Sequence, residues 1–441
     1  MEKKKLTLQE KLDKSKVKQP LVLGHWFYHF VFKYFYQKRA YNVEIKIKDD
    51  IRKCKSGCFL IFNHLSRLDH IFVNLATYPR RFNMLAGHNE FFRSHLHWAF
   101  KAQRIIPKKI YSTDLYSIKA MRKIIKMGGV VAFAPEGTSS IFGNNQPIVP
   151  GTGHFLKHFN VPVYFLKTEG AYLTQHKINN DVRKGKITAE LSLLFTPEDL
   201  KSMQKEEIED KINEVFKHDD YEWNKVHKIK FETKGNAGSH YHDILYKCPR
   251  CGEEFSMIGE KDYIKCNHCG NGAFIDDYYN LIPFDNNCVI PESPTKWSDW
   301  ERIEIIKAIR KDPNYEFKVK VKLGYLPPYH YVKDKKTTEI CGEGEYIVDH
   351  KGIHFRGTKL GEPFNIDEDY NVIYTPAIPT TVEFWAHYLK NGDYYEFFPD
   401  FPCAGKIIQL IQEMHRLHVN FFKNFKWNDY MYENLEENES K

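Results

Sequence analysis

The stretch CFLIFNHLSRLDH, residues 58–70, joins an unbroken apolar run to a segment with helical character. The run from Cys58 to Phe62 is typical of a buried strand, so His64 is expected just past a strand end, where α/β proteins place their reactive groups. Asp69 then falls in the first turn of the predicted helix. These residues alone leave two interpretations open. One is a catalytic histidine–aspartate pair, and the other is a helix cap in which Ser66 and Asp69 form Ser-x-x-Asp.

Short apolar runs alternate with amphipathic segments on either side of this stretch. Residues Val130 to Ala134 and Val161 to Leu166 have the composition of strands. Residues Asp114 to Met127 have helical periodicity and are followed by Gly128-Gly129, a helix stop. The alternation predicts an α/β domain over residues 42–217.

The strand predicted at Val130 to Ala134 runs into the turn Pro135-Glu136-Gly137-Thr138. A glycine permits a tight turn whose backbone N–H groups and hydroxyls can form a concave site for an anion such as phosphate. An ordinary strand-to-loop turn uses the same residue types. The turn by itself does not choose between these two interpretations.

Together, the two stretches resemble the glycerolipid acyltransferase family, which includes the 1-acylglycerol-3-phosphate acyltransferases. The similarity lies in Asn-His-x-Ser-x-x-Asp followed by Pro-Glu-Gly-Thr, and it covers roughly residues 51–171. The resemblance implies a catalytic His-x-x-x-x-Asp motif and further motifs that bind the phosphate of the acyl acceptor. The matching positions are His64 and Asp69 for catalysis, and Lys108, Glu136, Gly137 and Thr138 for binding the acceptor.

Other positions show how far the resemblance extends. The run Val161-Pro162-Val163 matches a further motif of the family, which is implied to shape the acyl pocket. The family usually has Phe before Pro-Glu-Gly and Arg after Gly-Thr, where this chain has Ala134 and Ser139. Lys108 stands where the family usually has Arg, and a lysine lacks the planar fork that binds phosphate through two hydrogen bonds. The identity of the acceptor therefore stays open.

Histidine suits the implied chemistry. An alcohol is a poor nucleophile at neutral pH, so acyl transfer to it benefits from a base that titrates near that pH. A carboxylate at Asp69 can fix the imidazole tautomer and stabilise the cation that forms. A rival interpretation takes Asp69-His70 as metal ligands of a hydrolase. No second His-Asp cluster with recognisable spacing occurs in the domain, so His70 is expected on a helix surface.

The N-terminal segment, residues 1–41, is predicted to associate with a membrane. Residues 20–40 are rich in aromatic side chains but carry His25, His29, Lys33 and Gln37 at intervals of four. On a helix these four form one polar stripe, which is expected to face water. The charge in the middle argues against a membrane span and favours an amphipathic helix lying in one leaflet. A core helix against the next domain is the alternative.

Four cysteines form two close pairs, CPRC and CNHC, in residues 243–290. Their spacing resembles that of a zinc ribbon, in which four thiolates complete a closed tetrahedral shell around a structural Zn²⁺. The predicted ligands are Cys248, Cys251, Cys266 and Cys269. A closed shell leaves no open position for catalysis.

The C-terminal region has short runs rich in Tyr, Phe, Ile and Val between turn residues, followed by one amphipathic helix. This order weakly resembles a pleckstrin-homology-like module. The chain is therefore expected to be a multidomain protein with an α/β acyltransferase domain, a small zinc ribbon, and a mostly β module closed by a C-terminal helix. Beyond the segments already given, the expected boundaries are a linker at 218–242, a linker helix at 291–335, the β module with its helix at 336–426 and an acidic tail at 427–441.

Composition agrees with a peripheral membrane enzyme. The 441 residues carry a formal net charge of +8, which favours anionic partners. The mean hydropathy of −0.55 argues against a bundle of membrane spans. The N-terminus shows no signal-peptide pattern, so a cytoplasmic location on the inner face of a membrane is expected.

The predicted reaction is transfer of a fatty acyl group from acyl-CoA or acyl carrier protein to a lysophospholipid. The expected acceptor is 1-acylglycerol 3-phosphate, which would give phosphatidate. The alternative is a catalytically inactive zinc-ribbon adaptor or nucleic-acid-binding protein. Acidic residues offset the lysines around the cysteine pairs, so no nucleic-acid partner is expected.

Overall fold

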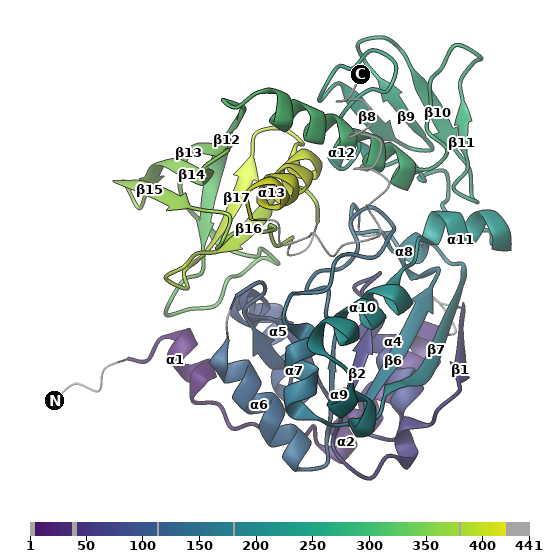
Figure 1. Ribbon diagram of the computed structural model, residues 1–441, viewed down its shortest axis with the longest axis vertical. Coiled ribbons are helices and arrows are strands. Elements are labelled where there is room, and N and C mark those ends of the chain that lie inside the picture. Colours follow the sequence, from purple (N-terminus) through teal and green to yellow (C-terminus); the bar gives the residue numbers. More distant parts are fainter. Residues whose placement is uncertain (1–4, 38–41, 113, 180, 379–380, 420–441) are drawn as a thin grey trace.

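The computed structural model describes residues 5–37, 42–112, 114–179, 181–378 and 381–419. These residues form three sheets, of seven, four and six strands. Figure 1 shows the seven-stranded sheet and its helices in the lower half of the molecule, with the two other sheets above it. The expected acidic tail at 427–441 and the end of the N-terminal segment at 38–41 lie outside the described residues.

The seven-stranded sheet has the order β1-β7-β6-β2-β5-β3-β4. Strands β6, β2, β5, β3 and β4 run parallel, whereas β7 is antiparallel to β6 and parallel to β1. The carboxyl ends of the five parallel strands therefore meet at one edge. The strands are β1 (Asn42–Ile47), β2 (Cys58–Phe62), β3 (Phe82–Gly87), β4 (Ile106–Lys108), β5 (Val130–Phe133), β6 (Val163–Glu169) and β7 (Lys186–Phe195).

Helices cover both faces of this sheet because successive side chains of the central strand β2 point to opposite sides. Leu60 belongs to the core that holds Phe72 of α4, whereas Ile61 belongs to the core that holds Met121 of α6. This arrangement confirms the predicted α/β fold. The helices around the sheet are α4 (Asp69–Thr77), α5 (Ser94–Ala102), α6 (Leu115–Lys126), α7 (Thr152–Phe159), α8 (Ala171–Thr174), α9 (Pro197–Ser202) and α10 (Lys205–Phe216), with the short turns η2 (Ile51–Lys53) and η3 (His88–Phe92).

The N-terminal segment contains α1 (Leu8–Asp13) and α2 (Val22–Val31), which continues as the π-helical η1 (Phe32–Tyr36). The expectation that the polar stripe faces water is wrong for its first half, because His25 and His29 are buried against the domain. The ring of His29 stacks on Tyr78 at 3.7 Å between centroids, and its Nδ1 lies 2.9 Å from Asn74 Oδ1. The apolar residues are the exposed ones. Among the described residues, no helix is both long and apolar enough to cross a bilayer.

Residues expected to form a linker at 218–242 are partly helical. They contain α11 (Asp220–His227) and the start of η4 (Tyr241–Asp243). The cysteine region follows as a four-stranded antiparallel sheet in the order β11-β10-β9-β8. Its strands are β8 (Met257–Glu260), β9 (Tyr263–Cys266), β10 (Gly272–Ile275) and β11 (Leu281–Pro283).

The third sheet starts earlier than expected. Of the predicted linker helix at 291–335, only α12 (Pro294–Lys311) is helical, and β12 (Glu316–Tyr325) already belongs to the six-stranded sheet. The order β15-β14-β13-β12-β17-β16 leaves two edges, so the strands form an open antiparallel sheet rather than a closed barrel. The remaining elements are β13 (Glu339–Asp349), β14 (Gly352–Lys359), β15 (Glu362–Glu368), β16 (Trp385–Tyr388), β17 (Tyr394–Pro399) and α13 (Ala404–Val419).

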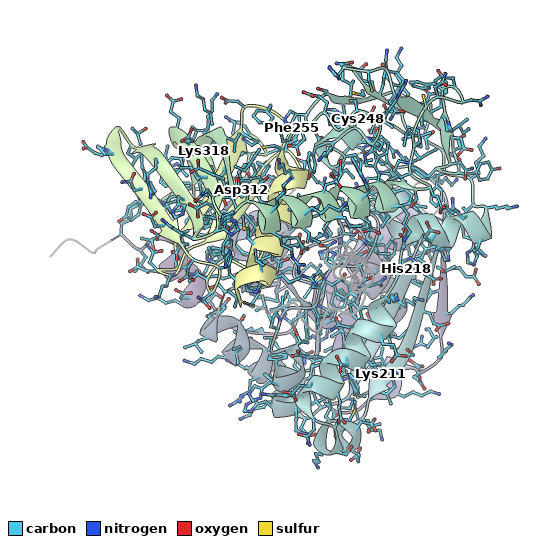
Figure 2. All side chains as sticks on the ribbon, turned by 45° about the horizontal axis from the view of Figure 1, so that its top comes forward. Lys211, His218, Cys248, Phe255, Asp312 and Lys318 are labelled. Carbon is cyan, nitrogen blue, oxygen red and sulfur yellow. The ribbon has the colours of Figure 1, made fainter. Side chains whose placement is uncertain are left out.

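Helix α12 connects the two upper sheets, and Figure 2 shows it running between the region of Cys248 and the region of Asp312. Its Arg302 is buried and pairs with Glu413 of α13, with Nη1 and Oε1 2.7 Å apart. Its Trp297 is buried and donates from Nε1 to the carbonyl of Lys247 at 3.0 Å. The C-terminal sheet is thereby fixed to the cysteine region and, through the contacts described below, to the seven-stranded sheet.

Candidate active site

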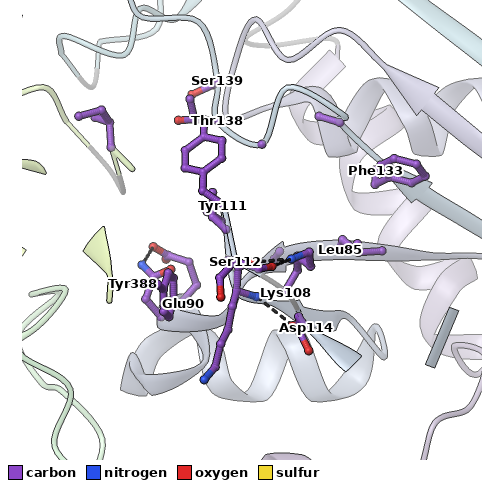
Figure 3. Close-up of a pocket in the computed structure, with 18 of the residues that line it drawn as sticks. Leu85, Glu90, Lys108, Tyr111, Ser112, Asp114, Phe133, Thr138, Ser139 and Tyr388 are labelled. Atoms are coloured by element: carbon purple, nitrogen blue, oxygen red, sulfur yellow. Dashed lines mark hydrogen bonds between the residues drawn. The ribbon is translucent and has the colours of Figure 1, made fainter. Parts of the chain in front are cut away.

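A cavity of about 1930 Å³ lies where the carboxyl ends of the parallel strands face the C-terminal sheet. His64 after β2, Lys108 at the end of β4 and the turn after β5 all line it. Residues of the C-terminal region such as Tyr374 and Tyr388 also line it, and Figure 3 labels Tyr388. The cavity therefore lies between the α/β domain and the C-terminal β region.

His64 and Asp69 form a hydrogen-bonded pair, with His64 Nδ1 2.7 Å from Asp69 Oδ2. The same carboxylate oxygen also accepts the backbone N–H of Ser66 at 3.3 Å. Asp69 is buried, and burial raises the pKa of its carboxyl, while the hydrogen bond from His64 opposes that shift. His64 lines the cavity and its side chain is 25% exposed. With Nδ1 bonded to Asp69, Nε2 is the nitrogen available to a substrate.

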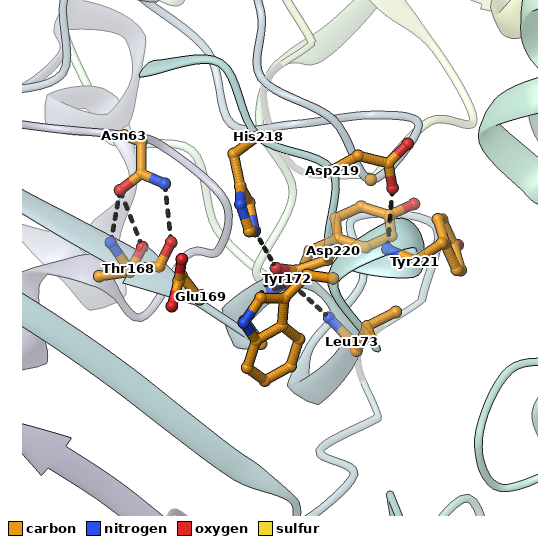
Figure 4. Close-up of polar contacts among 12 residues, drawn as sticks. Asn63, Thr168, Glu169, Tyr172, Leu173, His218, Asp219, Asp220 and Tyr221 are labelled. Atoms are coloured by element: carbon orange, nitrogen blue, oxygen red, sulfur yellow. Dashed lines mark hydrogen bonds and ion pairs between the residues drawn. The ribbon is translucent and has the colours of Figure 1, made fainter. Parts of the chain in front are cut away.

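The backbone on both sides of His64 is held in place. Asn63 extends the sheet, because its side-chain amide donates to the carbonyl of Thr168 at 2.8 Å and accepts the N–H of Thr168 at 2.7 Å (Figure 4). The carbonyl of His64 accepts the N–H of Ser140 at 2.6 Å. These bonds fix the loop from which the imidazole projects.

Glu136 supports the same loop from behind. Its carboxylate accepts the N–H of His64 at 2.5 Å and the N–H of Gln146 at 2.6 Å. The side chain is fully buried and is not among the residues that line the cavity. Burial raises the pKa of Glu136 to about 8. Glu136 therefore holds the backbone of His64 in place and does not contact an acceptor in the cavity directly.

The next residues of the turn do line the cavity. Gly137 has φ of +78°, and a Cβ there would lie 2.9 Å from the ring of Tyr111, so both the turn and its neighbour require glycine. The hydroxyls of Thr138 and Ser139 accept from the ammonium of Lys177, at 2.8 Å and 3.0 Å. Figure 3 shows this turn above Tyr111.

Lys108 lies on another side of the cavity, and its ammonium is engaged by the backbone. Its Nζ donates to the carbonyls of Lys109 at 2.6 Å and Ser112 at 2.7 Å, which closes the turn after β4 (Figure 3). Burial lowers the pKa of Lys108 to about 8. One N–H of the ammonium is left for a ligand.

Two expectations about neighbouring residues are wrong. His70 is not a free helix-surface residue: its Nδ1 lies 2.9 Å from the carbonyl of Arg67, and its ring packs edge-on against Phe32 of η1. The run Val161-Pro162-Val163 lies at the start of β6, whereas His64 follows the end of the parallel strand β2. These three residues are not part of the cavity wall. The apolar part of the wall includes instead Met84, Leu85, Phe100, Met121, Phe133 and Phe155.

Sequence reasoning missed several cationic residues of the cavity, among them Arg67, Arg93 and Lys177. Arg67 lies inside the His-x-x-x-x-Asp stretch, so its nearness to His64 was readable from the sequence. No sequence motif pointed to Lys177. It is a single lysine after α8, 39 positions beyond Thr138. Only the fold brings it to the turn.

The four predicted metal ligands are together at one end of the small sheet. The sulfur atoms of Cys248, Cys251, Cys266 and Cys269 all lie within 4.8 Å of one another. Two of the pairs are 3.6 Å and 3.8 Å apart, close to the roughly 3.8 Å expected between sulfurs of a tetrahedral Zn²⁺ shell with Zn–S bonds of about 2.3 Å. The donor set and its spacing fit a closed metal site. Within the described ranges, no other group of three or more His, Cys, Asp or Glu side chains could hold a metal ion.

Part of the first domain is similar to a known protein family. Residues 42–166 match the family model described as Acyltransferase. This stretch includes β2, β5 and the His64–Asp69 pair, so the similarity to acyltransferases covers the part of the seven-stranded sheet that holds the candidate site.

A more particular likeness is to a crystal structure. It is that of the 1-acyl-sn-glycerophosphate (LPA) acyltransferase PlsC from Thermotoga maritima, at 14% identity and a TM-score of 0.35, covering 47% of this chain and 94% of that chain. No curated protein matches the chain.

Proposed function

We propose that this protein transfers a fatty acyl group from acyl-CoA or acyl carrier protein to the free hydroxyl of a lysophospholipid. The proposed acceptor is 1-acylglycerol 3-phosphate, and the product is phosphatidate. The observation that carries the proposal is the His64–Asp69 pair, which opens into a large cavity within a domain that matches the acyltransferase model.

The mechanism uses the two nitrogens of one imidazole. Asp69 holds Nδ1 with its proton, so Nε2 has a lone pair for the acceptor hydroxyl. As Nε2 takes the hydroxyl proton, the oxygen attacks the thioester carbonyl and forms a C–O bond. The C–S bond then breaks, and the imidazolium returns the proton to the departing thiolate. Base assistance of this kind is worth about 10²–10⁴-fold in rate.

The cavity has room and apolar surface for the acyl chain. Met84, Met121, Phe133 and Phe155 line it from β3, α6, β5 and α7. Tyr28 and Phe32, from the N-terminal α2 and η1, also reach it. Flexible methionines and aromatic rings suit an alkyl chain. An acyl chain can therefore lie in the cavity with its thioester near His64.

The N-terminal helix supports attachment to a membrane surface, on its cytoplasmic face. Leu23 is 80% exposed and Trp26 is 54% exposed, and Leu21, Val22 and Phe27 are exposed beside them. Exposed apolar patches of this kind mark interaction sites. Because α2 also contributes to the cavity, a bilayer on its outer side would place lipid substrates next to the opening.

The cysteine cluster is proposed to hold a structural zinc ion. Cys248 and Cys266 are buried, and Gly252 and Gly270 adopt φ values of +75° and +77° in the two turns that close the pairs. Thiolates in this arrangement would complete the coordination shell, which stabilises the small sheet. The metal would take no part in acyl transfer.

The decisive experiment is incubation of purified protein with a labelled acyl donor and a panel of lysolipids. His64→Ala is expected to lower kcat by about 10²–10⁴-fold without loss of folding, because it removes the base alone. His158→Ala is the matched control, since His158 is exposed on α7 outside the cavity. Wild-type turnover by His64→Ala would refute the assignment. Absence of transfer with every lysolipid, combined with salt-sensitive nucleic-acid binding, would favour the adaptor alternative.

A further inference from the structure

Positive charge gathers on the cavity wall beside the turn after β5. Arg67, Arg93 and Lys177 line the same cavity as His64, and Glu90 lies among them. Glu90 is committed to Arg93, whose Nη1 lies 2.8 Å from its Oε2. When all four groups are ionised, the cluster has an excess of two positive charges. An excess of buried charge is costly unless an anion pairs with it.

Lys177 is the most deeply placed of the three cations. It is 5% exposed, and its ammonium donates to the hydroxyls of Thr138 and Ser139. Both partners are neutral, and no carboxylate of the described residues lies within ion-pair distance of its Nζ. The third N–H and the full positive charge remain for a ligand.

Arg67 offers hydrogen-bond donors to the same space. Its Nε and Nη2 are buried and have no hydrogen-bond partner in the part of the chain that the structure describes. Arg67 and Lys177 are close enough for each charge to disfavour the other, since Arg67 lowers the pKa of Lys177 after the larger effect of burial. A planar guanidinium beside an ammonium is suited to a phosphate, which accepts from both.

The loop that carries Lys177 is anchored at its start. The carboxylate of Asp220 accepts the N–H groups of Gly170 at 2.8 Å, Tyr172 at 2.8 Å and Leu173 at 3.3 Å (Figure 4). His218 holds the same carboxylate, with Nε2 2.6 Å from Oδ1. Helix α8 is thereby fixed, and the residues that follow it carry Lys177 to the turn. A preorganised cation binds an anion without the entropic cost of ordering a loop.

We propose that Lys177 and Arg67, with the hydroxyls of Thr138 and Ser139, bind the phosphate of the acyl acceptor. The assignment rests on the proposed function and adds to it two residues that determine acceptor specificity. A phosphomonoester carries nearly two negative charges at neutral pH, which match the two unpaired positive charges of the cluster. Lys108 contributes less, because its partners are backbone carbonyls, which cannot donate to a phosphate, whereas the hydroxyls beside Lys177 can.

The first test measures binding without catalysis. Inorganic phosphate is titrated calorimetrically into the full-length wild type, Lys177→Met and Arg67→Gln. Each substitution is expected to weaken phosphate binding by at least about 10-fold, because each removes hydrogen bonds to a charged group. Lys157→Met is the control: its ammonium donates to the carbonyls of Leu200 and Lys201 outside the cavity, so its phosphate affinity is expected to equal that of the wild type. Melting curves establish that each variant is folded, and Arg67→Gln decides the test if Lys177→Met does not fold.

The second test identifies which substrate carries the phosphate. Lys177→Met is expected to raise KM for 1-acylglycerol 3-phosphate at least about 10-fold, and to leave KM for acyl-CoA and for the phosphate-free monoacylglycerol unchanged. A rise in KM for acyl-CoA alone would place the donor's phosphates in the site and overturn the proposal. So would wild-type phosphate affinity in both Lys177→Met and Arg67→Gln. Should the wild type transfer no acyl group at all, the proposed function fails while the calorimetry still decides whether the anion site exists.

Discussion

Lys108 and Lys177, which both line the cavity, differ in what their ammonium groups contact. Lys108 bonds two backbone carbonyls and so stabilises the turn that carries it, whereas Lys177 bonds only two hydroxyls. Carbonyl dipoles partly satisfy a cation, but neutral hydroxyls can turn their own protons toward an incoming anion. A phosphate bound at Lys177 therefore meets donors from both the ammonium and the hydroxyls.

Burial gives Lys177 a pH dependence that can be measured. Burial first, and Arg67 second, lower the pKa of Lys177 to about 7, and the carboxylate of Glu90 opposes them. Arg93 also faces this cluster, paired with Glu90. The ammonium loses its charge as pH rises through about 7, so kcat/KM for 1-acylglycerol 3-phosphate, relative to monoacylglycerol, is expected to fall by about 10-fold between pH 7 and pH 9. The second ionisation of the phosphate, near pH 6, is complete over this range and does not cause the fall.

Lys177→Arg is the matched variant for this pH profile. A guanidinium stays charged throughout the range, so the fall is expected to disappear. Both acceptors use the same catalytic base. The ratio of their kcat/KM values therefore cancels any effect of pH on that base. A profile that falls equally in the wild type and in Lys177→Arg would contradict the role of Lys177.

Individual site residues differed in how far the sequence could predict them. His64 and Asp69 could be found because five positions of one loop suffice to bring them together. Glu136 could be found from its motif, but the direction of its side chain could not be predicted. Its carboxylate points toward the backbone of His64 and Gln146 and away from the cavity. Lys177 could not be found, because its partners Thr138 and Ser139 come from a different strand end.

At the scale of single elements, α2 shows why a periodic pattern does not say which side of a helix is buried. His25 and His29 do lie on one side of the helix, as their spacing predicted. The imidazoles, however, contact Asn74, Tyr78 and Phe82 of the α/β domain. The polar side therefore packs on the protein, and the apolar side faces outward. In contrast, the alternation of Lys and Val in β12 is typical of a half-buried strand and could have been predicted.

The outward side of α2 leads to a prediction for membrane binding. Replacing Trp26, Phe27 and Phe30 together by Ser is expected to weaken partitioning onto anionic vesicles by at least about 100-fold, since each buried aromatic side chain contributes about 1.5–3 kcal/mol. Co-flotation with vesicles measures the effect. Val226→Ser, which removes an exposed apolar side chain from α11, is the control and is expected to bind as the wild type does. Undiminished flotation of the triple variant would exclude α2 as the attachment site.

For the molecule as a whole, the three sheets and their helices pack against one another and do not form separate domains joined only by linkers. One cluster of buried apolar residues runs from Val43 to Met414 and includes residues of all three sheets. The buried Arg302–Glu413 pair joins α12 to α13, and Lys406 of α13 also pairs with Glu254 of the cysteine region. The sequence predicted three units along the chain, but it could not show that they pack together, because the partners lie more than a hundred positions apart.

This connectivity predicts the result of removing the proposed zinc ion. Cys251→Ser, or treatment with a chelator, is expected to lower the single calorimetric melting temperature of the whole chain by more than about 10 °C, because a structural Zn²⁺ contributes about 10–16 kcal/mol to the fold that binds it. Metal analysis is expected to find one zinc per chain. Cys288→Ser, at a half-buried cysteine outside the cluster, is expected to melt as the wild type does. Two separate transitions, of which only one moves, would show that the units unfold independently.

The shared wall of the cavity also has a consequence for biosynthesis. Residues 335–338 and the side chains of Tyr374 and Tyr388 complete the chamber, and Lys109 bonds the carbonyl of Gly392 across it at 3.3 Å. A nascent chain that has left the ribosome only as far as residue 290 has its histidine but still lacks this cover, so water reaches the place where a thioester would lie. For the proposed acyl transfer, the complete chamber is therefore expected only after α13 has been synthesised and the late strands have folded back onto the early ones.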